Sequence, residues 1–154
     1  MNETDDYVAV VRLQGAYADR VTRRAWEEFH DIFLADATVQ VDRRSGDPLV
    51  FRGPDGISGF IDDAFAAYPF FVFTILNTHV DLYPGGNRDL AHARTYICEN
   101  RQEHNGRFSQ AYGLYQDEYR RVDGRWWIAR RFYSSLGRTG DDLSTFPYPP
   151  SPFT

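Results

Sequence analysis

The sequence is poor in cysteine, in uninterrupted apolar runs and in net positive charge. Cys98 is the one cysteine of the 154 residues, so an internal disulfide and a cysteine-rich zinc site are both excluded. The N-terminus is acidic and then amphipathic, whereas a signal peptide starts basic and then turns apolar. No stretch approaches the ~18 apolar residues of a membrane span. We therefore expect a cytoplasmic protein in a reducing compartment, without membrane contact.

Short sequence motifs of binding and catalysis are also missing. Acidic residues outnumber basic ones by 22 to 17, which gives a net charge of -5 and argues against a nucleic-acid partner. The sequence has no HExxH, no nucleophile elbow and no phosphate-binding glycine-rich loop. A metal site needs three or four converging ligands, and the candidates are only His79, Glu99 and Asp81. We predict neither a metal nor a cofactor.

What the sequence holds in quantity is aromatic residues. Phe, Trp and Tyr make up 16% of the chain, which favours a large core or a cavity lined by rings. The length suits one compact domain, which we expect to span residues 1–136. Residues 137–154 hold four of the eight prolines and are predicted to form an extended tail. Its aromatic residues Phe146, Tyr148 and Phe153 would pack on the domain or on a second subunit.

The apolar period changes near residue 70. Before that point a 3.6-residue period predicts helices over 7–17, 26–33 and 54–68, the first capped near Thr4. Short strands are expected at 37–42 and 49–52. The later period of two, broken by turns, predicts long strands over 70–83, 90–103, 107–121 and 125–136. Three helices followed by an antiparallel meander, about six strands in all, predict the α+β class.

Taken in order, these pieces resemble a known family. The helices containing YADRVTRRAWEEFHDIFLADATV, the GPDGISGFI helix and the terminal hairpin DEYRRVDGRWWIARR are similar to the SnoaL-like branch of the nuclear transport factor 2-like superfamily. The resemblance implies a cone-shaped fold, in which a strongly bent antiparallel sheet packs against the helices and encloses an apolar pocket. Members include dehydratases, dehydrochlorinases, isomerases, polyketide cyclases and small subunits of ring-hydroxylating dioxygenases. The fold therefore does not define the function.

The resemblance also implies a catalytic pair that this sequence lacks. Dehydratase-like members carry an Asp five residues after a helical Tyr and a His on the first long strand, and that His removes a proton from carbon. Tyr17 matches the Tyr, but Thr22 stands at the Asp position and Ile75 at the His position. Arg131 matches a basic residue of the dehydrochlorinase-like members that points into the cavity and stabilises a departing anion.

Strand alternation offers a replacement for the missing histidine. Ile75, Asn77 and His79 share one face of the first long strand, so a cavity-facing Ile75 predicts that His79 also enters the cavity and acts as the base. The competing interpretation is a histidine near the strand end that bonds to backbone. A single bulge would reverse which of these residues face inward.

The later strands supply further pocket candidates. Ile97 and Glu99 lie on the face of the second long strand that is expected to face the cavity. A carboxyl in an apolar cavity can act as a base or an acid near neutral pH. Glu99 at the rim without a chemical role is the alternative. Tyr115 and Tyr133 are predicted to line the pocket. In the terminal hairpin Arg130 and Arg131 must point to opposite sides, while Arg120, Arg121 and Arg125 are expected to be solvated around the turn.

Two functions stay open from the sequence. The first is a cofactor-independent lyase, isomerase or cyclase acting on a ring-containing, weakly acidic small molecule, with Arg131 holding the anion, Tyr17 donating a hydrogen bond and His79 moving the proton. The second is a non-catalytic ligand-binding or accessory protein, including the small subunit of a ring-hydroxylating oxygenase, which Thr22 and Ile75 favour. The broad aromatic outer face of the sheet predicts a homodimer.

Overall fold

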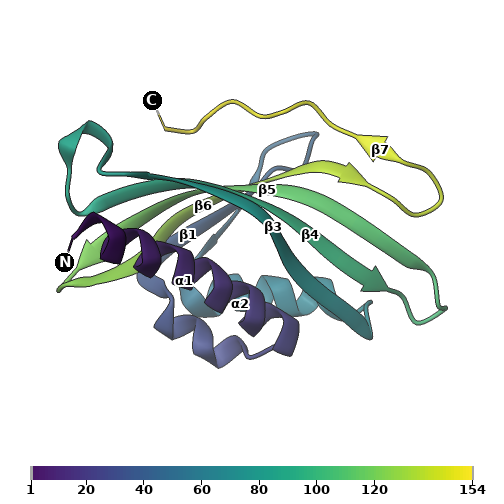
Figure 1. The fold of residues 1–154 in the computed structure, drawn as a ribbon. Helices are drawn as coiled ribbons and strands as arrows, with labels where there is room; N and C mark the ends of the chain where they lie inside the picture. Colours follow the sequence, from purple (N-terminus) through teal and green to yellow (C-terminus); the bar gives the residue numbers. More distant parts are fainter. Residues whose placement is uncertain (1, 154) are drawn as a thin grey trace.

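A curved sheet with helices on one side makes up the fold, seen in a computed structural model that describes residues 2–153 (Figure 1). The first residue of the predicted domain and the last of the predicted tail lie outside that range. The helical side carries α1 (Glu3–Arg23), the 3-10 helix η1 (Trp26–Asp31) and α2 (Gly53–Phe65). The sheet contains β1 (Phe33–Val41), β2 (Leu49–Arg52), β3 (Phe70–Leu82), β4 (Leu90–Gln102), β5 (Phe108–Val122), β6 (Arg125–Arg138) and β7 (Ser144–Thr145), with the 3-10 turn η2 (Pro84–Gly86) between β3 and β4. The α+β class is confirmed.

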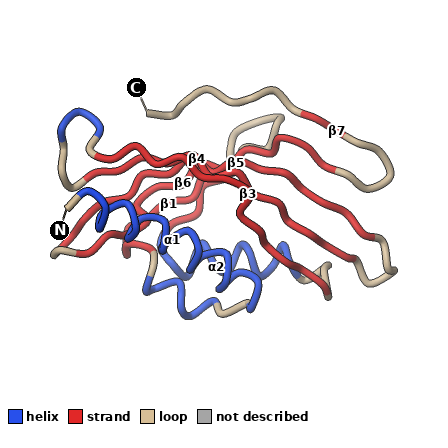
Figure 2. The backbone as a smooth tube through the Cα atoms, in the orientation of Figure 1, coloured by secondary structure: helices blue, strands red, loops and turns tan. Residues whose placement is uncertain are grey.

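The sheet is mixed rather than purely antiparallel. Its strand order is β2-β1-β6-β5-β4-β3, with β7 attached to the end of β6 (Figure 2). Strands β3 to β6 form the predicted antiparallel meander. Strand β1, however, runs parallel to β6, with Val39 opposite Arg131. Parallel pairing is possible because no short hairpin joins these two strands.

The helices differ from the prediction at their ends. The first one starts at Glu3, and its cap is Asn2 rather than Thr4, since the Asn2 side chain accepts a bond of 2.9 Å from the Asp5 amide. Apolar spacing detects only the buried face of a helix, so its polar ends were missed. The second predicted helix shortens to η1, because Phe33 already pairs with Ile128 in the sheet. No helix within residues 2–153 is long and apolar enough to cross a membrane.

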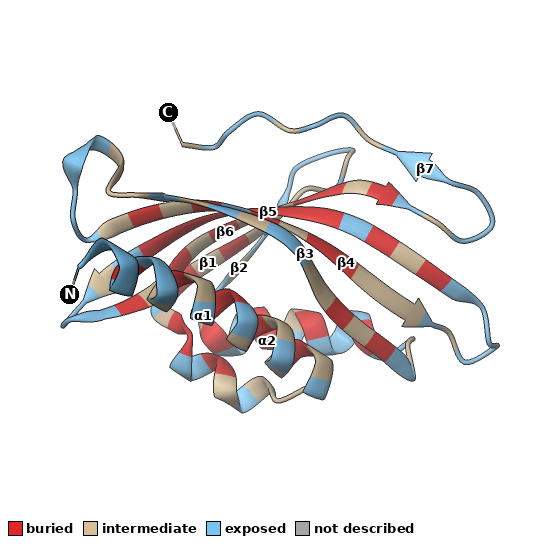
Figure 3. Ribbon diagram, in the orientation of Figure 1, coloured by how far each residue is buried: buried red, intermediate tan, exposed pale blue. Residues whose placement is uncertain are grey.

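The core lies between the helices and the inner face of the sheet (Figure 3). Tyr17 of α1 is its centre, with ring centroids of Phe29, Phe33, Phe73 and Tyr115 at 5.4–6.1 Å. Most of these pairs meet edge to face, the arrangement that aromatic quadrupoles favour. The packing fixes the position of α1 over β3 and β5.

An irregularity in the register of β3 decides which of its side chains face the core. The shift falls between Ile75 and Asn77, so Phe71 and Phe73 are buried before it, whereas Val80 packs on the core after it. A bulge adds one residue and so inverts the alternation of the strand beyond it. His79 lies beyond this shift, where it pairs with Arg94 and is exposed.

The C-terminal tail runs across the outer face of the sheet (Figure 1). Tyr148 and Tyr96 join their hydroxyls at 2.9 Å, and Phe153 stacks on His92 with 4.0 Å between ring centroids. The Gln116 side chain donates a bond of 3.1 Å to the carbonyl of Pro150. In the described structure Tyr148 and Phe153 thus contact strand β4 of their own chain.

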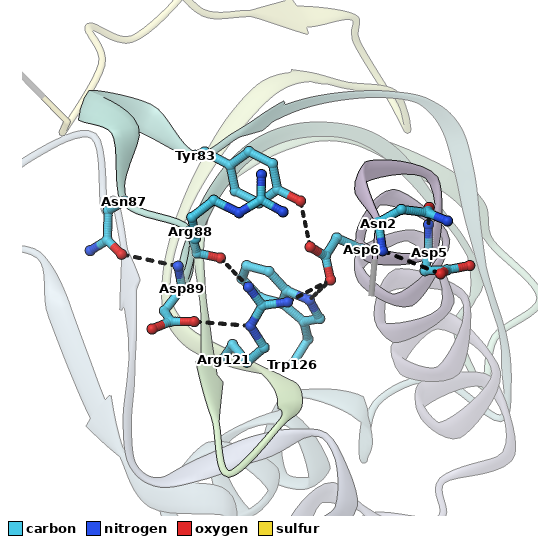
Figure 4. A network of polar contacts seen from close by, with 9 residues as sticks. All are labelled: Asn2, Asp5, Asp6, Tyr83, Asn87, Arg88, Asp89, Arg121 and Trp126. Carbon is cyan, nitrogen blue, oxygen red and sulfur yellow. Dashed lines mark hydrogen bonds and ion pairs between the residues drawn. The ribbon is translucent and has the colours of Figure 1, made fainter.

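Asp6 ties the start of α1 to strands β5 and β6 and to Tyr83, which lies between β3 and η2 (Figure 4). Its fully buried carboxylate accepts bonds from Trp126 Nε1 at 2.9 Å, from Arg121 Nη1 at 2.8 Å and from the Tyr83 hydroxyl. Burial disfavours the charged form, but these donors outweigh burial and hold the pKa of Asp6 below its ordinary value. Arg121 also binds Asp89 at 2.9 Å, so it is a structural residue and not the solvated one predicted.

Asp6→Ala should lower the free energy of unfolding by about 1–3 kcal/mol, because it leaves the buried Trp126 Nε1 without an acceptor and removes one of the two carboxylates that pair with Arg121. Urea unfolding followed by circular dichroism measures this change. The matched control on the same helix is Asp19→Ala, whose exposed pair with Arg23 is worth about 0.3–0.5 kcal/mol. Equal losses in the two variants would show that the Asp6 network does not anchor the helix.

Candidate functional site

A cavity of about 230 Å³ lies between the helices and the inner face of the sheet. Most of its wall is apolar, with the side chains of Val39, Val41, Phe51, Ile57, Phe60, Ile61, Ala64, Phe65 and Phe73. Its deeply buried polar groups are Tyr17, Tyr115 and Arg131, which form what we term the inner end. Glu99, Arg101 and Arg138 form the mouth, where the two arginines also border a depression on the surface. An apolar cavity with a few converging polar groups is typical of a small-molecule site.

Arg131 is held by a buried carboxylate. Its Nε and Nη2 donate to the two oxygens of Asp117 at 2.8 and 2.7 Å, and both side chains are almost fully buried. Burial works against the charge, but Asp117 keeps the pKa of Arg131 well above its ordinary value. The remaining nitrogen, Nη1, is buried and has no partner within residues 2–153. Arg131 thus contributes to the cavity wall a guanidinium with one unpaired donor and a charge that is already compensated.

Two tyrosines complete the inner end. The hydroxyls of Tyr17 and Tyr115 lie 3.3 Å apart, and both rings face the Arg131 guanidinium, at 4.3 and 3.9 Å from its central carbon. Burial raises the pKa of Tyr17, and raises that of Tyr115 well above its ordinary value. Both hydroxyls therefore stay protonated near neutral pH and can donate to a ligand oxygen.

Glu99 is the only acidic group in the described cavity wall. Its side chain is 18% exposed, and the nearest cation is Arg101, whose Nη1 lies 3.7 Å from Oε2. Burial raises the pKa of Glu99, while Arg101 and Arg138 oppose that change. Burial and the charge of Glu99 together raise the pKa of Tyr133 to about 12. A carboxyl that is poorly solvated and only loosely paired is suited to accept or deliver a proton.

The cavity brings together five of the predicted site residues, namely Tyr17, Glu99, Tyr115, Arg131 and Tyr133. Thr22 instead joins α1 to β3, since its Oγ1 accepts a bond of 3.1 Å from the Phe73 amide. Ile97 is fully buried in the core, and Ile75 packs against that core. These three residues do not line the cavity.

The prediction that His79 enters the cavity is wrong. The register shift before Asn77 turns Asn77 and His79 away from the helices, and both are exposed. His79 lines a separate depression on the outer face with Asp81, His92 and Phe153. It shares no cavity with Arg131 and cannot be the base there. Within residues 2–153 no cluster of three or more His, Cys, Asp or Glu is arranged to hold a metal ion.

Sequence reasoning missed Asp117, Arg101 and Arg138. Counting from the Asp123-Gly124 turn places Asp117 opposite Arg130, and only the register shift between Glu118 and Tyr119 moves it opposite Arg131. Asp117 lies two residues after the pocket candidate Tyr115 and shares its face of the strand, so strand alternation is the signal that could have found it.

Gly113 has a steric role beside this site. A Cβ at Gly113 would lie 2.5 Å from a ring carbon of Tyr133, which shows that glycine makes room for that wall of the cavity.

The family follows from a match over most of the chain. Residues 2–132 match the SnoaL-like domain. The chain belongs to the SnoaL-like family. Its sheet, helices and cavity are therefore the SnoaL-like fold, as predicted from the order of its pieces. A search of curated proteins found no match.

Solved structures of other proteins share this SnoaL-like fold. A candidate scytalone dehydratase from Novosphingobium aromaticivorans is 18% identical with a TM-score of 0.75, over 92% of this chain and 91% of that one. A hexachlorocyclohexane dehydrochlorinase from Novosphingobium barchaimii is 16% identical with a TM-score of 0.78, over 95% and 97%. A candidate aromatic ring hydroxylase from N. aromaticivorans is 26% identical with a TM-score of 0.71, over 95% and 96%. The first two similarities concern the fold alone.

Glu99→Gln should stabilise the protein at about pH 7 by on the order of 1 kcal/mol, because ionising Glu99 costs more in the folded than in the unfolded chain. Below the ordinary pKa of 4.5 the carboxyl is protonated in both states, so the gain should vanish there. Thermal unfolding of both proteins across this pH range measures the difference. Glu103→Gln, outside the cavity, is the control. A pH-independent gain would contradict a raised pKa.

Proposed function

We propose that this protein is a cofactor-independent lyase, isomerase or cyclase that moves a proton on a ring-containing small molecule bound in its cavity. One observation carries the proposal. Glu99, a carboxyl with a raised pKa, faces the same apolar cavity as the buried donors of Tyr17, Tyr115 and Arg131. General acid–base catalysis needs a proton acceptor together with donors for the oxygen that gains negative charge.

The residues divide the reaction between them. Glu99, as carboxylate, takes a proton from a ring carbon next to a carbonyl. The oxygen that becomes an enolate is met by the Tyr17 and Tyr115 hydroxyls and by Arg131 Nη1. Preorganised donors in a site without water favour this charge more than water would. The proton then returns to another carbon in an isomerisation, or a leaving group departs in an elimination.

Two relatives support a reaction of this class. Their names describe eliminations, of water by a candidate scytalone dehydratase and of hydrogen chloride by a dehydrochlorinase. In the present chain the proton acceptor would be Glu99 of β4, because Thr22 and Ile75 occupy the positions at which the resemblance implies an Asp–His pair.

A ligand-binding or accessory protein is the second candidate function. The absence of the Asp–His pair favours it, and the 26% identical structure bears the name of a candidate aromatic ring hydroxylase. The same cavity would then hold a small molecule without proton transfer. Association of two chains through the outer face of the sheet stays a prediction, and the tail occupies part of that face.

Deuterium exchange into 1-tetralone, a bicyclic aryl ketone, separates the two functions. We expect the protein to exchange the hydrogens next to the carbonyl about 10²-fold faster than buffer alone, and Glu99→Gln to lose this acceleration. Proton NMR in D₂O follows the exchange. His79→Gln, altered outside the cavity, should keep the wild-type rate. Equal rates in the wild type and Glu99→Gln would contradict catalysis and leave binding as the function.

A further inference from the structure

The mouth of the cavity has an excess of positive charge, although the whole chain carries -5. The described cavity wall has four charged residues, and the charge of one of them, Arg131, is neutralised by Asp117. Two arginines, Arg101 and Arg138, then face the single carboxyl of Glu99. The local charge is therefore opposite in sign to that of the protein as a whole.

Neither mouth arginine is fully engaged. Arg101 Nη1 lies 3.7 Å from Glu99, which is too far for a hydrogen bond, and its buried Nε has no partner within residues 2–153. Arg138 forms no ion pair with the described residues, whereas the neighbouring Arg107 pairs with Glu103 at 3.5 Å and with Asp141 at 3.2 Å. A buried guanidinium N–H without an acceptor costs free energy, which a ligand acceptor would recover.

The inner end differs from the mouth in what it can bind. Arg131 keeps one buried free donor, but its charge is balanced by two hydrogen bonds to Asp117. Such a donor suits a hydroxyl or carbonyl oxygen. A ligand carboxylate there would keep a permanent second negative charge beside Asp117 in a poorly solvated space, unlike the transient and delocalised charge of an enolate.

We propose that the ligand is a ring compound with two unlike polar ends, a carboxylate held at the mouth by Arg101 and Arg138 and a hydroxyl or carbonyl oxygen at the inner end. The proposal rests on the small-molecule cavity of the proposed function but not on its chemistry. Planar guanidinium groups bind carboxylates through two parallel donors. When Glu99 is ionised, the two arginines and Glu99 leave one positive charge at the mouth. One ligand carboxylate neutralises that charge, so we expect the ligand to be a monoanion. This assignment moves the anion from Arg131, where the sequence placed it, to the mouth.

A matched pair of fluorescent probes tests the proposal. 6-Hydroxy-2-naphthoate carries the carboxylate, and 6-hydroxy-2-naphthamide replaces it by a neutral group of the same shape. We expect the naphthoate to bind at least about tenfold more tightly, since bonds between charged groups are the stronger ones. Arg138→Gln should abolish this preference and leave amide binding unchanged. Because Arg138 is exposed, its replacement is not expected to affect folding.

Arg107→Gln is the matched control, an arginine beside the mouth that is already paired and outside the cavity wall. It should keep the preference for the naphthoate. Equal affinity for the two probes, a preference that survives both Arg138→Gln and Arg101→Gln, or no binding of either probe would overturn the proposal.

The two proposals fail in different ways. A carboxylate preference that depends on Arg138, found together with absent exchange into 1-tetralone, would contradict the catalytic function alone. Exchange that depends on Glu99, found without a carboxylate preference, would contradict the anionic ligand alone.

Discussion

The buried ion pair between Asp117 and Arg131 is the interaction on which the site depends. Charges at this depth are tolerated only when they are paired and hydrogen-bonded, and here two bonds of 2.8 and 2.7 Å join them. The Tyr119 hydroxyl also donates to Asp117 at 2.8 Å, and two tyrosine rings cover the guanidinium. The pair thereby holds the Arg131 guanidinium at the cavity wall with one nitrogen unpaired, and it compensates the charge that Arg131 would otherwise present to a ligand.

This compensation gives the cavity two chemically different ends. The inner end offers neutral hydroxyls and a charge-balanced donor, whereas the mouth keeps two arginines against one carboxyl. Glu99 is loosely held there by Arg101, so its proton affinity responds to burial more than to its partner. An apolar wall between such ends orients a ligand by its polarity as well as by its shape.

The predictions from sequence were correct for features that depend on local residue patterns. They were wrong for features that depend on the pairing of distant segments. Period and turn residues were sufficient for the α+β class and its order of elements. Alternation placed Glu99 at the cavity, and the family resemblance placed Arg131 there. His79 was misplaced because the register shift near residue 76 inverts β3, which no composition signal marks. The role of Arg121 was hidden because its partner Asp6 lies at the other end of the chain.

A crystal structure with bound 6-hydroxy-2-naphthoate tests the division of the cavity most directly. The account predicts the hydroxyl oxygen within hydrogen-bonding distance, about 2.7–3.2 Å, of Arg131 Nη1 or a hydroxyl of Tyr17 or Tyr115, with the carboxylate between Arg101 and Arg138. A ligand bound in the reverse orientation, with its carboxylate on Arg131, would contradict it. So would a ligand bound in the outer depression beside His79.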